Sequence, residues 1–236
     1  MRQSIIKLAL PVILLASASA LSALAGEAPD VVYWGSEEGK TLRARMAVDA
    51  DYWQLSLTFA VQNTQTYCSV ASAITVLNAL PIKKPVDPVY APYAYFTQGN
   101  YFTPEVTTVI SPQTVLSMGM TREEMARTLT MHGASAKSIA GDTLGDDSLR
   151  TLLQKALGDD GQFVLANYFR ANLEQAGGGH WSVLAAYDAP TDRVLILDVA
   201  KYKYPPAWVG VGTLRQALAT LDSTSNKMRG LVIVSK

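Results

Sequence analysis

Two apolar runs on either side of a short polar turn decide the fold, and together they read WSVLAAYDAPTDRVLILDV over residues 181–199. The runs are rich in Val, Leu, Ile and aromatic residues, which favour β-strands, and the DAPTD segment between them is typical of a turn. We therefore expect an antiparallel hairpin here. Two more runs of this kind, 162–169 and 231–235, continue the pattern towards the C-terminus. The sequence thus predicts an antiparallel sheet.

Helical patterns come earlier in the chain. The segment SVASAITVLNAL at 69–80 is apolar on all sides, contains no Gly or Pro and predicts a buried helix. Further helices are predicted at 121–132, which opens with a capping box, and at 148–157. Because helices come first and strands second, we expect an α+β fold with a helical lobe at about 51–158 and a sheet lobe at about 159–236.

The composition excludes several classes of partner and site. Lys and Arg together number 20, as do Asp and Glu, so the 236-residue chain has no basic excess for a phosphate backbone. We therefore expect no nucleic-acid partner. One cysteine and two histidines exclude an internal disulfide and a zinc site built from several such ligands. We accordingly predict no metal site in the protein itself.

Residues 1–25 have the pattern of a secretory signal. Arg2 and Lys7 precede an apolar stretch at 8–24, and the segment ends in Ala-Leu-Ala, the small-x-small form of a signal-peptidase site. We predict that this signal is cleaved, leaving 26–236 as one exported, periplasmic domain without membrane contact. A retained membrane anchor is the alternative, because the apolar stretch is near the lower limit for spanning about 30 Å of hydrocarbon.

The single cysteine, Cys68, directly precedes the predicted helix 69–80. Free backbone amides and the helix dipole favour an anion at a helix N-terminus. A thiol there can have its pKa lowered from about 8.5 to roughly 3.5 to 7.5, especially beside an imidazolium. A lone cysteine in an exported chain either pairs with another molecule or does chemistry. We therefore interpret Cys68 as a thiolate nucleophile; a buried, inert cysteine is the alternative.

Three further residues favour a catalytic role for Cys68, although each alone is more commonly structural. His180 follows three glycines and begins a predicted strand, which makes it a candidate general base. Asp198 ends the apolar run VLILD, where a buried acid needs a partner, and the Nδ1–H of an adjacent imidazole is a natural one. Gln62 lies shortly before Cys68 and can donate a hydrogen bond to an oxyanion, with the Cys68 backbone N–H as second donor.

Gln, Cys, His and Asp in this order are typical of a papain-type thiol acyltransferase or hydrolase. The residues around the cysteine differ from those of papain, which disfavours a general endopeptidase. An exported papain-like peptidase, a cell-wall amidase and a thiol-binding protein without catalysis stay open as alternatives.

Three longer strings carry a family resemblance. NTQTYCSVASAITVLNAL at 63–80, GGGHWSVLAAYDAPTDRVLILDVAKYKYPP at 177–206 and KMRGLVIVSK at 227–236 resemble phytochelatin synthase, a glutathione γ-glutamylcysteinyltransferase. The likeness is greatest to the short bacterial form, which is the catalytic domain alone, and extends from about residue 51 to the last residue. It implies a papain-like two-lobed fold, with the nucleophile on the helical lobe and the His and Asp on the sheet lobe.

The resemblance also assigns roles. It implies that Cys68 is the nucleophile, His180 the general base, Asp198 the orienting acid and Gln62 the oxyanion donor. Glutathione is the implied substrate: Cys68 forms a γ-glutamylcysteinyl thioester, releases glycine and passes the acyl group to a second glutathione or to water. No tightly bound cofactor is implied. A heavy metal such as cadmium or zinc is expected to arrive as a glutathione thiolate complex, and a homodimer is suggested.

Substrate recognition must handle the two carboxylates and the ammonium group of glutathione. The candidates lie on the predicted sheet lobe and are Asn167, Tyr168, Arg170, Gly179, Lys201 and Arg229. Where plant relatives usually carry arginine three residues after the acid, this chain has Lys201, which keeps the charge but loses bidentate geometry. For the cations an ordinary surface position is the alternative, and for Asn167 and Tyr168 it is packing within the sheet.

Overall fold

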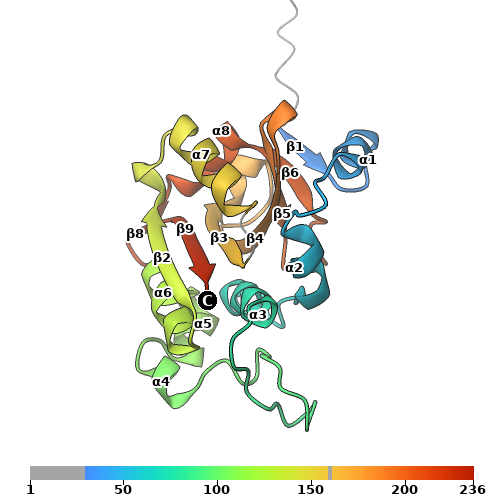
Figure 1. Ribbon diagram of the computed structural model, residues 1–236. Helices are drawn as coiled ribbons and strands as arrows, with labels where there is room; N and C mark the ends of the chain where they lie inside the picture. The colour runs from blue at the N-terminus through green and yellow to red at the C-terminus, as the bar shows by residue number, and fades with distance from the viewer. Residues whose placement is uncertain (1–29, 159–160) are drawn as a thin grey trace, which may run out of the picture.

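An antiparallel sheet forms the centre of the molecule in the computed structural model, which describes residues 30–158 and 161–236 (Figure 1). The predicted signal at 1–25 lies outside the described residues. Seven strands form the sheet in the spatial order β1-β6-β5-β4-β3-β9-β2. In that order they span Val31–Tyr33, Ala207–Gly210, Arg193–Leu197, Gly179–Asp188, Gln162–Phe169, Gly230–Ser235 and Ser135–Ala140. The combination of helices and an antiparallel sheet confirms the predicted α+β class.

Helices cover both faces of this sheet. Buried side chains of α1 to α6 join one hydrophobic cluster, and those of α7 and α8 join a second cluster on the opposite face. The helices are α1 (Glu37–Ala44), α2 (Tyr52–Thr58), α3 (Cys68–Ala79), α4 (Pro104–Thr107), α5 (Pro112–Met118), α6 (Arg122–Met131), α7 (Asp146–Ala156) and α8 (Val211–Leu218). A small separate ribbon pairs β7 (Leu221–Asp222) with β8 (Lys227–Met228).

Burial on both faces explains why the strand sequences are almost continuously apolar. Successive side chains of a strand point to opposite faces of a sheet. In β3, Phe163 and Leu165 join the cluster that contains α3, whereas Val164 and Ala166 join the one that contains α7 and α8. A strand with solvent on one face would instead alternate apolar and polar residues.

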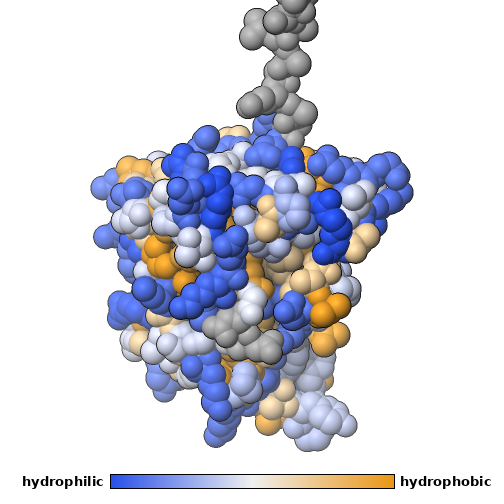
Figure 2. All heavy atoms as spheres, turned by 45° about the horizontal axis from the view of Figure 1, so that its top comes forward, coloured by the Kyte–Doolittle hydropathy of each residue, from blue (hydrophilic) through white to orange (hydrophobic). Residues whose placement is uncertain are grey.

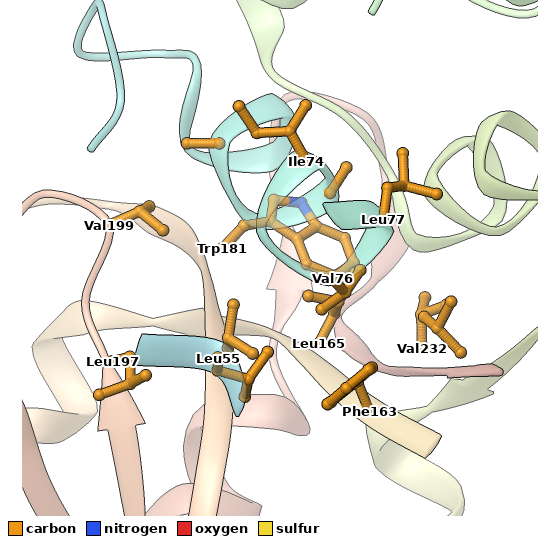
Figure 3. Close-up of a cluster of buried hydrophobic side chains, with 14 of the residues drawn as sticks. Leu55, Ile74, Val76, Leu77, Phe163, Leu165, Trp181, Leu197, Val199 and Val232 are labelled. Atoms are coloured by element: carbon orange, nitrogen blue, oxygen red, sulfur yellow. The ribbon is translucent and has the colours of Figure 1, made fainter. Parts of the chain in front are cut away.

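Helix α3 is the predicted buried helix, and it begins at Cys68. Its apolar side chains lie among those of the sheet, with Ile74, Val76 and Leu77 close to Trp181 (Figure 3). Full burial of one such aliphatic side chain contributes about 1.5–3 kcal/mol to stability. This packing fixes the helix, and with it the cysteine at its first turn, against the sheet.

The predicted hairpin is confirmed as β4 and β5. Asp188 pairs with Arg193 at the turn, and Val183 pairs with Leu197 at the other end of the ladder. A short 3-10 turn at Ala189–Thr191 connects the strands, and a bulge between Leu184 and Ala186 shifts the register. The predicted capping box is present as well, at the start of α6.

The predicted boundary between a helical part at 51–158 and a sheet part at 159–236 is too simple. Strand β1 pairs with β6, and β2 pairs with β9, so two edge strands of the sheet precede residue 159. The sequence of β2, SAKSIA, is half-exposed and lacks a run of large apolar residues. Its pairing along β9 is a long-range contact that local patterns do not encode.

Hydrophilic side chains cover most of the face in Figure 2, and hydrophobic ones form separate patches. Among residues 30–158 and 161–236, none of the helices is long and apolar enough to cross a membrane.

Candidate active site

The predicted nucleophile lies where α3 begins. Cys68 is 7% exposed, and it lines a cavity of about 270 Å³. The N-terminus of a buried helix presents free backbone N–H groups and the positive end of the helix dipole. Cys68 therefore lies where the sequence predicted, at the start of a helix. It also borders a cavity and contacts the sheet.

The sheet brings His180 and Asp198 to this cysteine. His180, the second residue of β4, makes a side-chain hydrogen bond with Cys68. Asp198 directly follows β5, and its Oδ1 lies 2.8 Å from Nε2 of His180. The structure thus assembles the predicted Cys–His–Asp set from segments far apart in the sequence.

The prediction that Asp198 binds Nδ1 of the imidazole is wrong. The carboxylate of Asp198 lies against Nε2 of His180 instead. Because Nε2 is engaged by the acid, Nδ1 is the ring nitrogen left to face the thiol of Cys68.

Electrostatics place the proton on the imidazole. Burial raises the pKa of the Cys68 thiol. The charge and hydrogen bond of His180 lower this pKa, and so do the backbone amides of Trp181 and Ser69. Together these contributions leave the pKa of Cys68 below its ordinary value. Burial lowers the pKa of His180, whereas Cys68 and the bond to Asp198 raise it above its ordinary value. The two directions together favour a thiolate–imidazolium pair.

The acid is held by a buried arginine. Oδ1 of Asp198 accepts hydrogen bonds from Nη2 of Arg170 at 3.0 Å and from the backbone N–H of Ala200 at 2.8 Å. Nη1 of Arg170 lies 2.8 Å from Oδ2 of Asp198 and also donates to Gln175. Burial raises the pKa of Asp198, but His180 and Arg170 lower it to about 2. The carboxylate therefore stays ionised.

This pairing corrects the prediction for Arg170. The residue borders a cavity, but its guanidinium is engaged by Asp198 and Gln175, and the side chain is 4% exposed. An arginine at the end of an apolar strand looks like a surface charge in the sequence. Its partner lies 28 residues further along the chain, so no local signal identifies the pair.

Of the remaining candidates on the sheet, Asn167 lies at the cavity and Tyr168 lies in the core. Asn167 lines the cavity beside Cys68. Tyr168 is fully buried on the opposite face of β3, where its ring contacts that of His180 edge-on, with 5.7 Å between the ring centres. The predicted contact of Tyr168 with substrate is therefore not supported, and the residue packs behind the base.

Lys201 does not join these residues. It is exposed, its Nζ lies 5.8 Å from the ring centre of Phe59, and other residues form the lining of both cavities near the site. Lys201 therefore lines neither of the two cavities that His180 borders.

Arg229 forms the far wall of the cavity that contains Cys68. Its guanidinium lies 5.4 Å from the ring centre of Phe169, and its Nη2 lies 3.4 Å from Oδ1 of Asp222. Its Nε is buried without a hydrogen-bond partner within the part of the chain that the structure describes. Gly179 lies against this guanidinium, since a Cβ there would be 2.5 Å from Nη2. Asp222 was missed in the sequence because it lies in a two-residue strand.

A second cavity of about 340 Å³ lies on the other side of His180. It shares Gln65 and the residues Gly178 to His180 with the first cavity, and its own lining includes Gln62, Tyr202 and Lys203. Two openings therefore meet at the imidazole.

Gln62 is buried at this second cavity. Its Nε2 donates to the carbonyl of Thr64 at 2.8 Å and to the hydroxyl of Tyr202 at 2.9 Å. Tyr202 is 60% exposed. The amide nitrogen of Gln62 is therefore engaged by two acceptors, and the role of Gln62 as an oxyanion donor stays a prediction.

The comparison with known families shows to which family the chain belongs. The family profile described as phytochelatin synthase matches residues 26–231. The chain belongs to the phytochelatin synthase family. The resemblance seen in the sequence is thereby confirmed, and the Cys–His–Asp set lies within the matched residues.

Curated members of the phytochelatin synthase family are similar over most of the chain. "Glutathione gamma-glutamylcysteinyltransferase 1" of Triticum aestivum is 30% identical over 88% of this chain and 41% of its own length. The protein of that name from Arabidopsis thaliana is 28% identical over 88% of this chain and 42% of its own length. The chain thus spans less than half of these relatives. The Pseudomonas avirulence protein AvrPphB is 12% identical, with a TM-score of 0.31 over 77% of this chain and 97% of its own, which carries no argument about the fold.

Within residues 30–158 and 161–236, no three His, Cys, Asp or Glu side chains lie together as potential ligands. Nothing about the requirement for metal follows from this.

Proposed function

We propose that this protein is a glutathione γ-glutamylcysteinyltransferase that works through a thioester on Cys68. The observation that carries the proposal is the continuous set of hydrogen bonds from Cys68 through His180 to Asp198, at the edge of a cavity. Membership of the phytochelatin synthase family supplies the substrate class. We further propose a papain-like plan, in which a helix carries the nucleophile and a sheet carries the base and acid; the positions of Cys68 at the start of α3 and of His180 in β4 support it.

Acylation begins with the thiolate. Cys68 attacks the carbonyl carbon that joins the cysteine of glutathione to its glycine, and a tetrahedral oxyanion forms. His180 then gives its proton to the glycine nitrogen, the C–N bond breaks, and glycine leaves as the thioester forms. The Cys68 backbone N–H and the Gln62 side chain would hold the oxyanion, and loss of one such donor costs roughly 100- to 1000-fold in kcat.

The γ-glutamyl end would lie in the cavity that Arg229 closes. This group carries an α-carboxylate and an α-ammonium on the same carbon, so it needs a cation and an anion side by side. The guanidinium of Arg229, which lines this cavity, suits the carboxylate, and Asp222 beside it suits the ammonium. Asn167 supplies a further polar group on the same wall. The pair would select a γ-glutamyl group over an ordinary peptide.

Deacylation would proceed from the second cavity. His180 takes a proton from the incoming nucleophile, which attacks the thioester and returns the thiolate. The α-amine of a second glutathione gives a phytochelatin, and water gives γ-glutamylcysteine. Lys203 at this opening suits an acceptor carboxylate. We propose that cadmium or zinc enters here as a glutathione thiolate complex, that is, as part of the substrate. The charged start and apolar stretch of residues 1–25 support export to the periplasm.

Mass spectrometry of the protein incubated with glutathione tests this function. The expected result is a mass increase of one γ-glutamylcysteinyl group on Cys68, lost in Cys68→Ser, together with released glycine. Peptides without a γ-glutamyl bond serve as the comparison substrate. Cleavage of these peptides with glutathione left intact would show a peptidase or amidase and overturn the proposal.

A further inference from the structure

We propose that Gln98 is a positioning residue that holds Gln62 in place at the cavity bordered by His180; this inference rests on the proposed oxyanion role of Gln62. Gln98 is 8% exposed and comes from the turn between the short isolated bridge at Ala94 and helix α4. It lies outside the two cavities that meet at His180, so it acts on the chemistry through Gln62 rather than by touching substrate.

The amide of Gln98 binds the chain on both sides of Gln62. Its Oε1 accepts from the backbone N–H of Asn63 at 2.9 Å. Its Nε2 donates to the backbone carbonyl of Val61 at 2.8 Å and to Oδ1 of Asn63 at 3.1 Å. From the opposite side, the backbone N–H of Gln62 donates to the carbonyl of Val199 at 3.0 Å. The loop is therefore fixed between Gln98 and the segment that follows Asp198.

The turn that carries Gln98 is itself tied to the nucleophile's helix. Asn78 of α3 donates from Nδ2 to the carbonyl of Phe96 at 2.8 Å and accepts from the Phe96 N–H at 2.9 Å. Both hydrogen bonds are buried, where an unpaired backbone group is costly. One chain of contacts thus runs from α3 through Asn78, Phe96 and Gln98 to Gln62. It sets the distance between the oxyanion donor and the thiol at the start of the same helix.

This arrangement matters because an oxyanion donor acts only in the right place. A misplacement of about 1 Å in a catalytic group can cost on the order of 100-fold in rate. In Gln98→Leu the loop keeps its bond to Val199 but loses three from Gln98. We expect kcat to fall about tenfold, with KM changed less than about twofold, because the transition state is affected and ground-state binding is not.

A double-mutant cycle on glutathione turnover tests the inference. We compare Gln62→Ala, Gln98→Leu and the double variant, with Gln98→Glu as a second change that keeps the acceptor for the Asn63 N–H but loses the donor to Val61. Tyr187→Phe is the control, since it removes one hydrogen bond, to Asp192, away from the site. The expected result is that Gln98→Leu lowers kcat about tenfold alone but less than about twofold in the Gln62→Ala background.

The other possible outcomes refute either the positioning role of Gln98 or the oxyanion role of Gln62. If Gln62→Ala lowers kcat and Gln98→Leu lowers it equally in both backgrounds, the two residues act independently and the inference about Gln98 is wrong. If Gln62→Ala leaves kcat unchanged, the oxyanion role of Gln62 fails, and the inference fails with it. Should Gln98→Leu not fold, Gln98→Glu must show an intermediate loss of kcat that vanishes in the Gln62→Ala background; an additive loss refutes the proposal.

Discussion

Replacement of Arg170 by Met distinguishes an arginine that supports the acid from one that binds substrate. Nη1 of Arg170 lies 2.8 Å from Oδ2 of Asp198, and the two side chains are 4% and 3% exposed. Removing one partner of a buried ion pair leaves the other charge uncompensated and typically costs about 3–5 kcal/mol. Because Asp198 keeps its hydrogen bond from His180, we expect the free energy of unfolding to fall by the lower value, about 3 kcal/mol.

The same replacement changes how stability depends on pH. Burial raises the pKa of Asp198, but His180 and Arg170 lower it to about 2. A carboxyl group whose pKa is depressed in the folded state stabilises the fold above its unfolded pKa of about 3.9, and this stabilisation is lost as the pH falls towards 2. The shift corresponds to about 2.5 kcal/mol at neutral pH. Without Arg170 the pKa of Asp198 rises, so the part of the stability that acid removes becomes smaller.

Guanidinium denaturation at pH 7 and at pH 3 measures both effects. The control is Arg150→Met, which breaks a pair with Asp192 whose side chains are 35% and 37% exposed, and should cost less than about 1 kcal/mol. The reasoning is refuted if Arg170→Met is no more destabilising than Arg150→Met and instead raises KM for glutathione. Arg170 would then be the substrate-binding arginine that the sequence first suggested.

Two further predictions concern the cavity wall. Arg229→Met should raise KM for glutathione about 10- to 100-fold, because a charge-assisted bond to the substrate carboxylate is lost. Steady-state kinetics measure this change. An unchanged KM would mean that the substrate carboxylate binds elsewhere. Gly179→Ala should raise KM about tenfold, since its Cβ would lie 2.5 Å from Nη2 of Arg229 and displace the guanidinium. If Gly179→Ala alters KM as much in the Arg229→Met background as alone, the two residues do not act together.

Local patterns were sufficient for the elements whose own side chains determine them. The buried helix at 69–80, the strand at 162–169 and the hairpin through DAPTD all correspond to observed elements, because continuous burial leaves an apolar run in the sequence. The edge strands β1 and β2, the short buried strand β6 and helix α8 were not predicted. The edge strands are short and half-exposed, and their partners lie far along the chain.

The site likewise combines features that residue type and order predict with features that only the folded structure shows. The chemistry of Cys68, His180 and Asp198 could be inferred from residue type and order. The ring nitrogen that faces the acid could not, because it depends on how the imidazole is oriented in the folded site. The partners of Arg170 and Arg229 could not be inferred either. Each arginine is buried and paired with a carboxylate that lies close only in the folded chain. The sequence alone shows that the arginine is charged but not which residue is its partner.

The ionisation of Cys68 by His180 is the central claim, and the pH dependence of alkylation by iodoacetamide measures it most directly. In the wild-type protein, the alkylation rate should titrate with an apparent pKa well below the ordinary thiol value of about 8.5. In His180→Gln the apparent pKa should rise above the ordinary value, because burial of Cys68 then acts with little opposition. Titration of both proteins at the same pKa, near or above the ordinary value, would contradict the thiolate–imidazolium pair.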